Sequence, residues 1–311
     1  MASSNQQFNF FSLEATGRSR TLIAQTHQPG PYFYRGKEIP GLHGDTAISL
    51  DQAYVCVGGS RERIIYDLTD PALKPFAEKM ENALEAFEKE RAFELALTPP
   101  IDDADDDQQN NAQTASPLTP ADFFDFLAQF VKSFFHTHSE QEIFALKEKY
   151  HLETGTVNEN DLKYLPLSYA VQHGVGVCRH QVLLAIYLTL VYFKEENALS
   201  MQVYRLRESL RSIDPKDYDA KGQYRAGAPL FAHAVMVANF KNGQRFFVDA
   251  AHSFSLEISA VTEAKDLANL QDKFVKHYPG LNIGSFILFT NASYTNLARK
   301  QPKTILSAPK P

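Results

Sequence analysis

The chain has 311 residues, of which 44% are hydrophobic and 22% are charged, and its formal net charge is −6. This is the composition of a globular protein able to bury a large core, and it lacks the basic excess typical of nucleic-acid-binding proteins, so no nucleic-acid partner is expected. The two cysteines, Cys56 and Cys178, exclude a disulfide framework and favour a reducing compartment.

The ends and apolar runs of the chain bear on where the protein acts. The longest apolar run, residues 182–193, is shorter than the roughly 20 residues of a membrane span, so no membrane span is expected. Residues 1–20 lack the basic segment and long apolar stretch of a secretory signal peptide. These features predict a cytoplasmic protein, or one exported without such a signal.

Residues 1–97 predict an N-terminal strand-and-helix region. Five apolar segments separated by Gly, Pro and Asp are typical of short strands: 20–25, 31–36, 46–50, 53–59 and 63–68. Cys56 lies in one of them among apolar neighbours, and we interpret it as a packing residue. Residues 70–97 carry an apolar stripe from Leu73 to Phe93 at helical spacing, with Glu and Lys opposite, which predicts a helix packed on one side.

Residues 98–118 separate this region from the rest of the chain. They are acidic, rich in amides and bracketed by prolines, which predicts a flexible linker. The N-terminal region is then either packed on the following domain or joined to it by this linker alone. A catalytic domain is expected at 119–295 and a loose tail at 296–311.

The second half of the chain opens with two helix starts. Thr119 and Pro120 are typical of an N-cap and a first helical position, and Ser139 with Glu142 forms a capping box. From Cys178 onward the pattern predicts the following elements, taken in chain order: an apolar helix, a strand, a polar loop at 207–230, a hairpin with strands at 231–240 and 244–252, a helix near 262–278 and a strand at 284–290.

Cys178 stands between a glycine-containing turn and the apolar helix. Gly174 and Gly176 allow a tight turn and leave room beside the thiol for a substrate. The first turn of a helix directs unpaired N–H groups and the positive end of its dipole outward, which favours the nucleophilic thiolate. A packing cysteine needs neither these glycines nor the Arg179 and His180 that follow, so we interpret Cys178 as a nucleophile.

Two further residues complete a catalytic pattern. His233 on one strand is placed to take the thiol proton and return it to a leaving amine, and Asp249 on the next strand to orient that imidazole. His252 is the alternative base, whereas His180 lies two residues along the helix and points away from the thiol. A metal site of Cys178, His180 and His252 lacks the usual zinc spacing, so we expect neither metal nor cofactor.

Strand parity sets a condition on this pair. With a two-residue hairpin turn, His233 and Asp249 would face opposite sides of the sheet. A three-residue loop between Phe240 and Gln244 puts both on one face as diagonal neighbours, roughly 7–8 Å apart at the backbone. Such loops, with Gly in the left-handed position, are a common hairpin class. The sequence therefore predicts the three-residue loop, with Asp249 bonded to His233 and the His233 ring near the Cys178 sulfur.

The segments GVGVCRHQVLLAIYL, AHAVMVANF and RFFVDAAH resemble the transglutaminase-like branch of the papain-like cysteine enzymes. The resemblance implies an α+β papain-like fold, in which the helix bearing the cysteine packs on an antiparallel sheet. It makes Cys178 the nucleophile, His233 the general base and acid, and Asp249 the orienting carboxylate. Gln172 is placed like the papain-like glutamine that donates to the oxyanion. Its alternative role is to cap the short helix before the cysteine.

The chain also departs from this family. Animal transglutaminases have Trp beside the cysteine, where this chain has Arg179, and it contains no Trp and no calcium-loop pattern. This difference favours hydrolysis over protein cross-linking. We therefore expect thiol-dependent attack on amide bonds of a protein or peptide through an acyl-enzyme, as in a cysteine protease or glutamine deamidase. The alternatives are a transglutaminase that transfers the acyl group to an amine, and a catalytically silent binding module. A bacterial effector also suits the resemblance.

Overall fold

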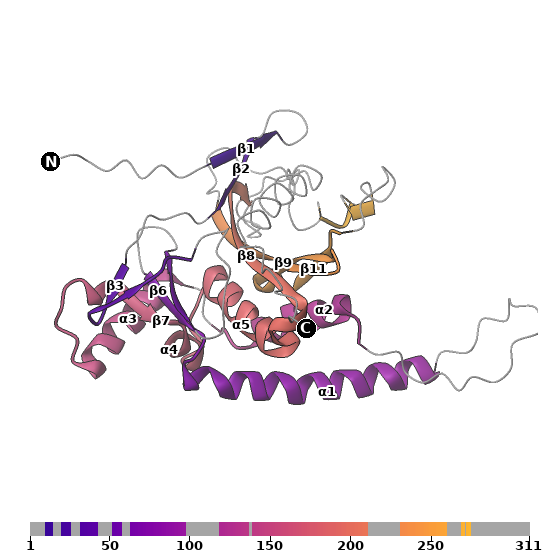
Figure 1. The fold of residues 1–311 in the computed structure, drawn as a ribbon, viewed down its shortest axis with the longest axis horizontal. Helices are drawn as coiled ribbons and strands as arrows, with labels where there is room; N and C mark the ends of the chain where they lie inside the picture. The colour runs from indigo at the N-terminus through magenta and orange to yellow at the C-terminus, as the bar shows by residue number, and fades with distance from the viewer. Residues whose placement is uncertain are drawn as a thin grey trace, which may run out of the picture.

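The computed structural model describes residues 10–14, 20–25, 32–42, 52–57, 63–97, 118–136, 139–210, 231–259, 269–270 and 272–274. These residues form a mixed α+β fold of helices and largely antiparallel sheets (Figure 1). The expected strands at 46–50 and 284–290, residues 98–117 of the expected linker, and the tail at 296–311 lie outside them.

The main sheet has six strands in the order β1-β2-β8-β9-β10-β11, and each neighbouring pair is antiparallel. Their bounds are Phe10–Glu14 (β1), Arg20–Gln25 (β2), Ala198–Leu210 (β8), Phe231–Phe240 (β9), Arg245–Asp249 (β10) and Phe254–Glu257 (β11). Strand β8 continues to Leu210, into the segment expected to be loop, and its register with β9 shifts between Leu206 and Leu210.

Two smaller sheets lie in the N-terminal half. Strands β3 (Tyr32–Tyr34) and β4 (Lys37–Ile39) form a hairpin. Strands β5 (Ala53–Val57) and β6 (Arg63–Asp67) pair antiparallel, and β7 (Tyr164–Pro166) adds to β6 in parallel. The strands predicted at 31–36, 53–59 and 63–68 are confirmed as β3, β5 and β6, whereas β4 and β7 were not predicted.

The described residues between 71 and 252 contain five named α-helices and three 3₁₀ turns, and residues 269–270 and 272–274, within the helix predicted near 262–278, are also helical. The helices are α1 (Lys74–Leu97), α2 (Pro120–Ser133), α3 (Glu140–Thr154), α4 (Leu167–Gln172) and α5 (Cys178–Asn197), and the turns are η1 (Pro71–Leu73), η2 (Asp161–Lys163) and η4 (Ala250–His252). The N-cap predicted at Thr119 and the capping box predicted at Ser139 are both present, and Thr119 also forms a capping box with Asp122. Within the described part of the chain, no helix has the length and apolar character to cross a membrane.

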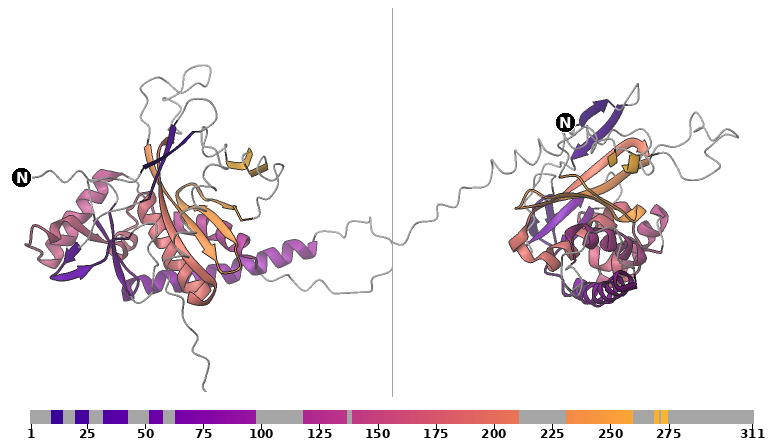
Figure 2. Two further views of the ribbon diagram at one scale, coloured as in Figure 1. Left: turned by 45° about the horizontal axis from the view of Figure 1, so that its top comes forward. Right: turned by 90° about the vertical axis from the view of Figure 1, so that its right-hand side faces the viewer.

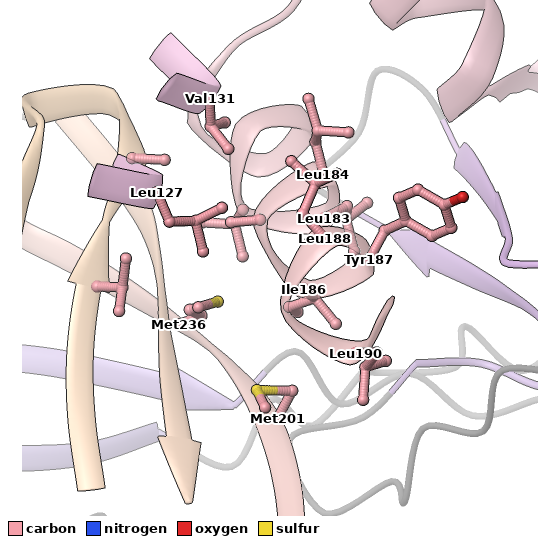
Figure 3. Packing of buried hydrophobic residues seen from close by; sticks show 14 of the residues in the cluster. Leu127, Val131, Leu183, Leu184, Ile186, Tyr187, Leu188, Leu190, Met201 and Met236 are labelled. Atoms are coloured by element: carbon pink, nitrogen blue, oxygen red, sulfur yellow. The ribbon is translucent and has the colours of Figure 1, made fainter. Parts of the chain in front are cut away.

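Helix α5 lies at the centre of the molecule, between the main sheet and α1 (Figures 1 and 2). Every residue from 181 to 190 is buried. Figure 3 shows Leu184, Ile186 and Leu188 on this helix, with Met236 of β9 on the sheet side. Burying side chains of this size contributes about 1.5–3 kcal/mol each, so packing holds α5 in place.

Both sides of the expected linker contribute to one hydrophobic cluster. Tyr66 and Met80, from the N-terminal region, belong to the same cluster as Phe124, Leu184 and Met236. Strand β2 also lies beside β8, and β7 beside β6. Of the two arrangements that the sequence allows, the packed one is therefore observed.

The stripe predicted along α1 is buried only in its first half. Phe76, Met80 and Leu84 are buried, but Phe93 is 66% exposed. A helix of 24 residues is about 36 Å long, and Figure 1 shows its C-terminal end extending past the other helices. Helical spacing therefore predicted the helix correctly, but the expectation that Phe93 packs was wrong.

Candidate functional site

Cys178 is the first residue of α5 and is partly exposed. The chain reaches it through Gly174, whose φ is +64°, and Gly176. A Cβ on Gly174 would overlap the His136 ring, and one on Gly176 would overlap the Phe135 ring. The glycines are thus required for close packing, and His136 and Phe135 occupy the space that side chains at these two positions would take.

The hairpin has the predicted three-residue loop. Phe240 N–H donates to the Gln244 carbonyl at 2.8 Å, and Gly243 has a φ of +89°. The ladder then runs from Arg245 opposite Asn239 to Val248 opposite Met236. This register is the one that places His233 and Asp249 on one face of the sheet, so the register prediction is confirmed.

Asp249 is fully buried and accepts hydrogen bonds from two imidazoles and two backbone N–H groups. Its Oδ2 accepts from His233 Nε2 at 2.9 Å and from His252 Nδ1 at 2.6 Å. Its Oδ1 accepts from the backbone N–H groups of Ala251 and His252, at 3.0 and 3.3 Å. Burial alone would raise the pKa of Asp249. The charge of His233 and the hydrogen bonds from both imidazoles outweigh it and hold that pKa well below its usual range.

His233 links this carboxylate to the thiol. Burial lowers its pKa, but the charge of Asp249 and hydrogen bonds to Asp249 and Cys178 raise it to about 10. Because Nε2 is bonded to Asp249, Nδ1 is the ring atom left for the Cys178 sulfur. The imidazole therefore sits between the two other members of the expected triad.

The environment of Cys178 favours the thiolate. Burial raises the thiol pKa, but the hydrogen bond to His233, the charge of that imidazole, the Ala234 N–H and the charge of Arg179 lower it below its ordinary value. Ala234 lies on β9, two residues before Met236, which is the last β9 residue paired with β10. Beyond that pair β10 ends and η4 begins, and the Ala234 N–H bonds to the Cys178 sulfur. This arrangement favours an imidazolium–thiolate pair over the neutral imidazole and thiol.

The other expected histidines take different positions. His252, the alternative base, bonds to Asp249, whereas the hydrogen bond from the thiol to an imidazole goes to His233. His180 is buried, and its Nδ1 accepts the Val177 N–H at 3.3 Å. Burial is the larger cause that lowers the pKa of His180 well below 6.5, and the charge of Arg179 lowers that pKa further. The imidazole of His180 is therefore neutral.

Gln172 is an exposed residue and is the last of α4. Its proposed hydrogen bond to an oxyanion stays a prediction. The helix is followed by His173, whose Nδ1 lies 3.0 Å from the Tyr169 carbonyl. Cys56, by contrast, is buried in β5 at 1% exposure, as its apolar neighbours predicted.

Two features of the site were missed from the sequence. The first is the Ala234 N–H, which carries no signal in side-chain patterns. The second is the hydrogen bond from His252 to Asp249, which the sequence pattern did indicate. Asp249 caps the 3₁₀ turn that starts at Ala250, and a residue three positions after such a cap lies close to it.

Comparison with known proteins adds no relative. No family model matches the chain, and neither a curated protein nor a solved structure matches it. The geometry of Cys178, His233 and Asp249 is therefore the basis for any assignment of function.

Proposed function

We propose that the protein is a thiol-dependent hydrolase of transglutaminase-like type, which attacks amide bonds of a protein or peptide through an acyl-enzyme on Cys178. The observation that carries the proposal is the hydrogen-bonded chain from Cys178 through His233 to Asp249. Its members lie on a helix start and two adjacent antiparallel strands, in the chain order of the papain-like core. The packing of α5 on the main sheet supports that core.

Acylation follows from the state of the pair. The Cys178 thiolate attacks the amide carbonyl carbon, and the carbonyl electron pair moves to oxygen. As the tetrahedral intermediate collapses, His233 gives its Nδ1 proton to the departing nitrogen, and the C–N bond breaks. Asp249 holds the ring through Nε2 and compensates its positive charge. The products of this half-reaction are a thioester on Cys178 and a free amine or ammonia.

Deacylation reverses the proton path. Neutral His233 takes a proton at Nδ1 from water, the hydroxide oxygen bonds to the thioester carbon, and the C–S bond breaks to return the thiolate. The acceptor in this proposal is water, since Arg179 stands where animal transglutaminases have Trp. The catalytically silent alternative is disfavoured by a thiol pKa below its ordinary value.

The developing oxyanion needs hydrogen-bond donors. The N-terminus of α5 offers the backbone N–H of its first residue, Cys178, as one donor. Gln172 is proposed as a second donor, because it is exposed and ends the short helix that leads into the glycine turn. The loss of one such donor costs about 10²–10³ in kcat.

Intact-mass spectrometry with an electrophilic glutamine-containing peptide tests the nucleophile. The full-length protein should gain one adduct, and Cys178→Ala should gain none. The matched control is Cys56→Ala, which removes the buried thiol and should label like the wild type. An adduct that persists in Cys178→Ala, or that disappears in Cys56→Ala, rejects the assignment.

The acceptor is read from substrate products. A panel of peptides containing glutamine and an added primary amine is incubated with the enzyme and analysed by mass. Deamidation adds about 1 Da, cleavage gives fragments, and transfer adds the mass of the amine. Hydrolysis without amine incorporation is expected, and dominant amine incorporation would replace the hydrolase proposal by a transglutaminase.

A further inference from the structure

A cluster of three side chains has ligand chemistry beyond the proposed hydrolysis. His233 Nε2 and His252 Nδ1 approach one oxygen, Asp249 Oδ2, at 2.9 and 2.6 Å. One ligand atom of each residue lies within 4.8 Å of the others. Two imidazole nitrogens and a carboxylate oxygen are a set that zinc takes in tetrahedral protein sites. This set differs from the combination of Cys178, His180 and His252 that was considered from the sequence. His180 does not join it, because its Nδ1 accepts the Val177 N–H.

We propose that His233, Asp249 and His252 form a zinc-binding site at which Zn²⁺ blocks the triad. Around tetrahedral zinc, neighbouring ligand atoms lie roughly 3.3 Å apart, so the 2.9 Å pair must open by about 0.4 Å and the 2.6 Å pair by about 0.7 Å. His252 is suited to that movement, because it is partly exposed and lies on the short turn η4. The ion enters from its side, and water completes the coordination.

Zinc on these atoms changes what His233 can do. A ring nitrogen that gives its lone pair to a metal carries no proton, so the ring proton stays on Nδ1, facing Cys178. The imidazole then cannot take a proton from water, and the acid–base step stops. The sulfur is not a ligand in this proposal, which separates it from the direct binding of zinc to a reactive thiolate.

Calorimetric titration of the full-length protein with zinc chloride tests the site. Wild type should bind one Zn²⁺, and Cys178→Ser should bind it within about twofold of the wild-type affinity. His252→Ala should bind at least about tenfold more weakly, because a ligand is lost. The matched control is His136→Ala, an exposed histidine beside Gly174, which should bind like the wild type.

Three results would overturn the site: no zinc binding by the wild type, undiminished binding by His252→Ala, or loss of binding in Cys178→Ser, which would place the ion on the sulfur. Circular dichroism checks that each variant is folded. Among the three proposed ligands, His252 is the one that is partly exposed, so its substitution disturbs the fold least. Because binding is measured without substrate, the result stands or falls separately from the proposed hydrolysis.

Alkylation gives a second readout. Saturating zinc should leave the rate of Cys178 alkylation by iodoacetamide within about threefold of the zinc-free rate, since the sulfur remains accessible. Complete protection of Cys178 by zinc would place the ion on the thiolate and reject the proposed ligand set. The same measurement on His252→Ala should show no zinc effect.

Discussion

Asp249 sets the protonation pattern of the site. With Oδ1 held by two backbone N–H groups, its Oδ2 faces both imidazoles, so each ring donates an N–H to it. This fixes Nε2 of His233 as a donor and leaves Nδ1 for Cys178. The carboxylate raises the pKa of His233, and the charged imidazole in turn lowers the pKa of the thiol.

The exchange Asp249→Asn tests this linkage. Loss of the negative charge should lower the pKa of His233 from about 10 toward its ordinary value and raise the pKa of Cys178. The thiolate then forms only at higher pH, so the midpoint of Cys178 alkylation against pH should move up by about 1–3 units. The control is Asp272→Asn at an exposed position, whose profile should match the wild type. An unmoved midpoint in Asp249→Asn would contradict the linkage.

The turn before α5 is the element that positions the nucleophile. Gly174 combines a φ of +64° with close contact to His136, whereas Gly155 after α3 has nearly the same φ of +63° and open space around it. A comparison of substitutions at the two glycines therefore separates the free-energy cost of backbone strain from the cost of steric contact. Any shift at Gly174 is passed along four residues to Cys178.

Gly155→Ala should cost about 1–2 kcal/mol in unfolding free energy, because an L residue is strained in the left-handed region. Gly174→Ala should cost about 1–3 kcal/mol more, since its new methyl group also overlaps the His136 ring. Chemical denaturation measures both. Adding His136→Ala to Gly174→Ala should remove most of the difference. Equal costs for the two glycine variants would show that the contact is unimportant.

The large hydrophobic cluster around α5 contains residues from both sides of the expected linker. Met80 of α1 and Met236 of β9 are both fully buried in it. The N-terminal region therefore supports the helix that carries Cys178. We expect the two regions to unfold together.

Met80→Ala tests that expectation and should lower the unfolding free energy by about 2–5 kcal/mol in a single transition. Phe93→Ala is the matched control on the same helix. Because Phe93 is 66% exposed, it should cost about 0.5 kcal/mol or less. Two transitions in Met80→Ala, with Cys178 reactivity lost only in the second, would show that the regions fold separately.

Local chemistry explains which features could be read from the sequence. The caps at Thr119 and Ser139, the helix start at Cys178 and the loop ending at Gln244 each depend on a few adjacent residues. The pairing of β2 with β8 and of β6 with β7 joins segments far apart in the chain, and no local pattern encodes it. For the same reason, the filling of the space beside Gly176 by Phe135 was not foreseen.

The burial of α5 from residue 181 to 190 bears on how the proposed hydrolase can adapt. A substitution along that stretch changes the core, so it is selected first for stability and only then for substrate choice. His136, which lies against Gly174, is exposed, so a substitution there leaves the core unchanged, whereas His252 is held by its hydrogen bond to Asp249. A lineage that acquires a new substrate is therefore expected to vary at exposed positions such as His136 while the body of the helix stays the same.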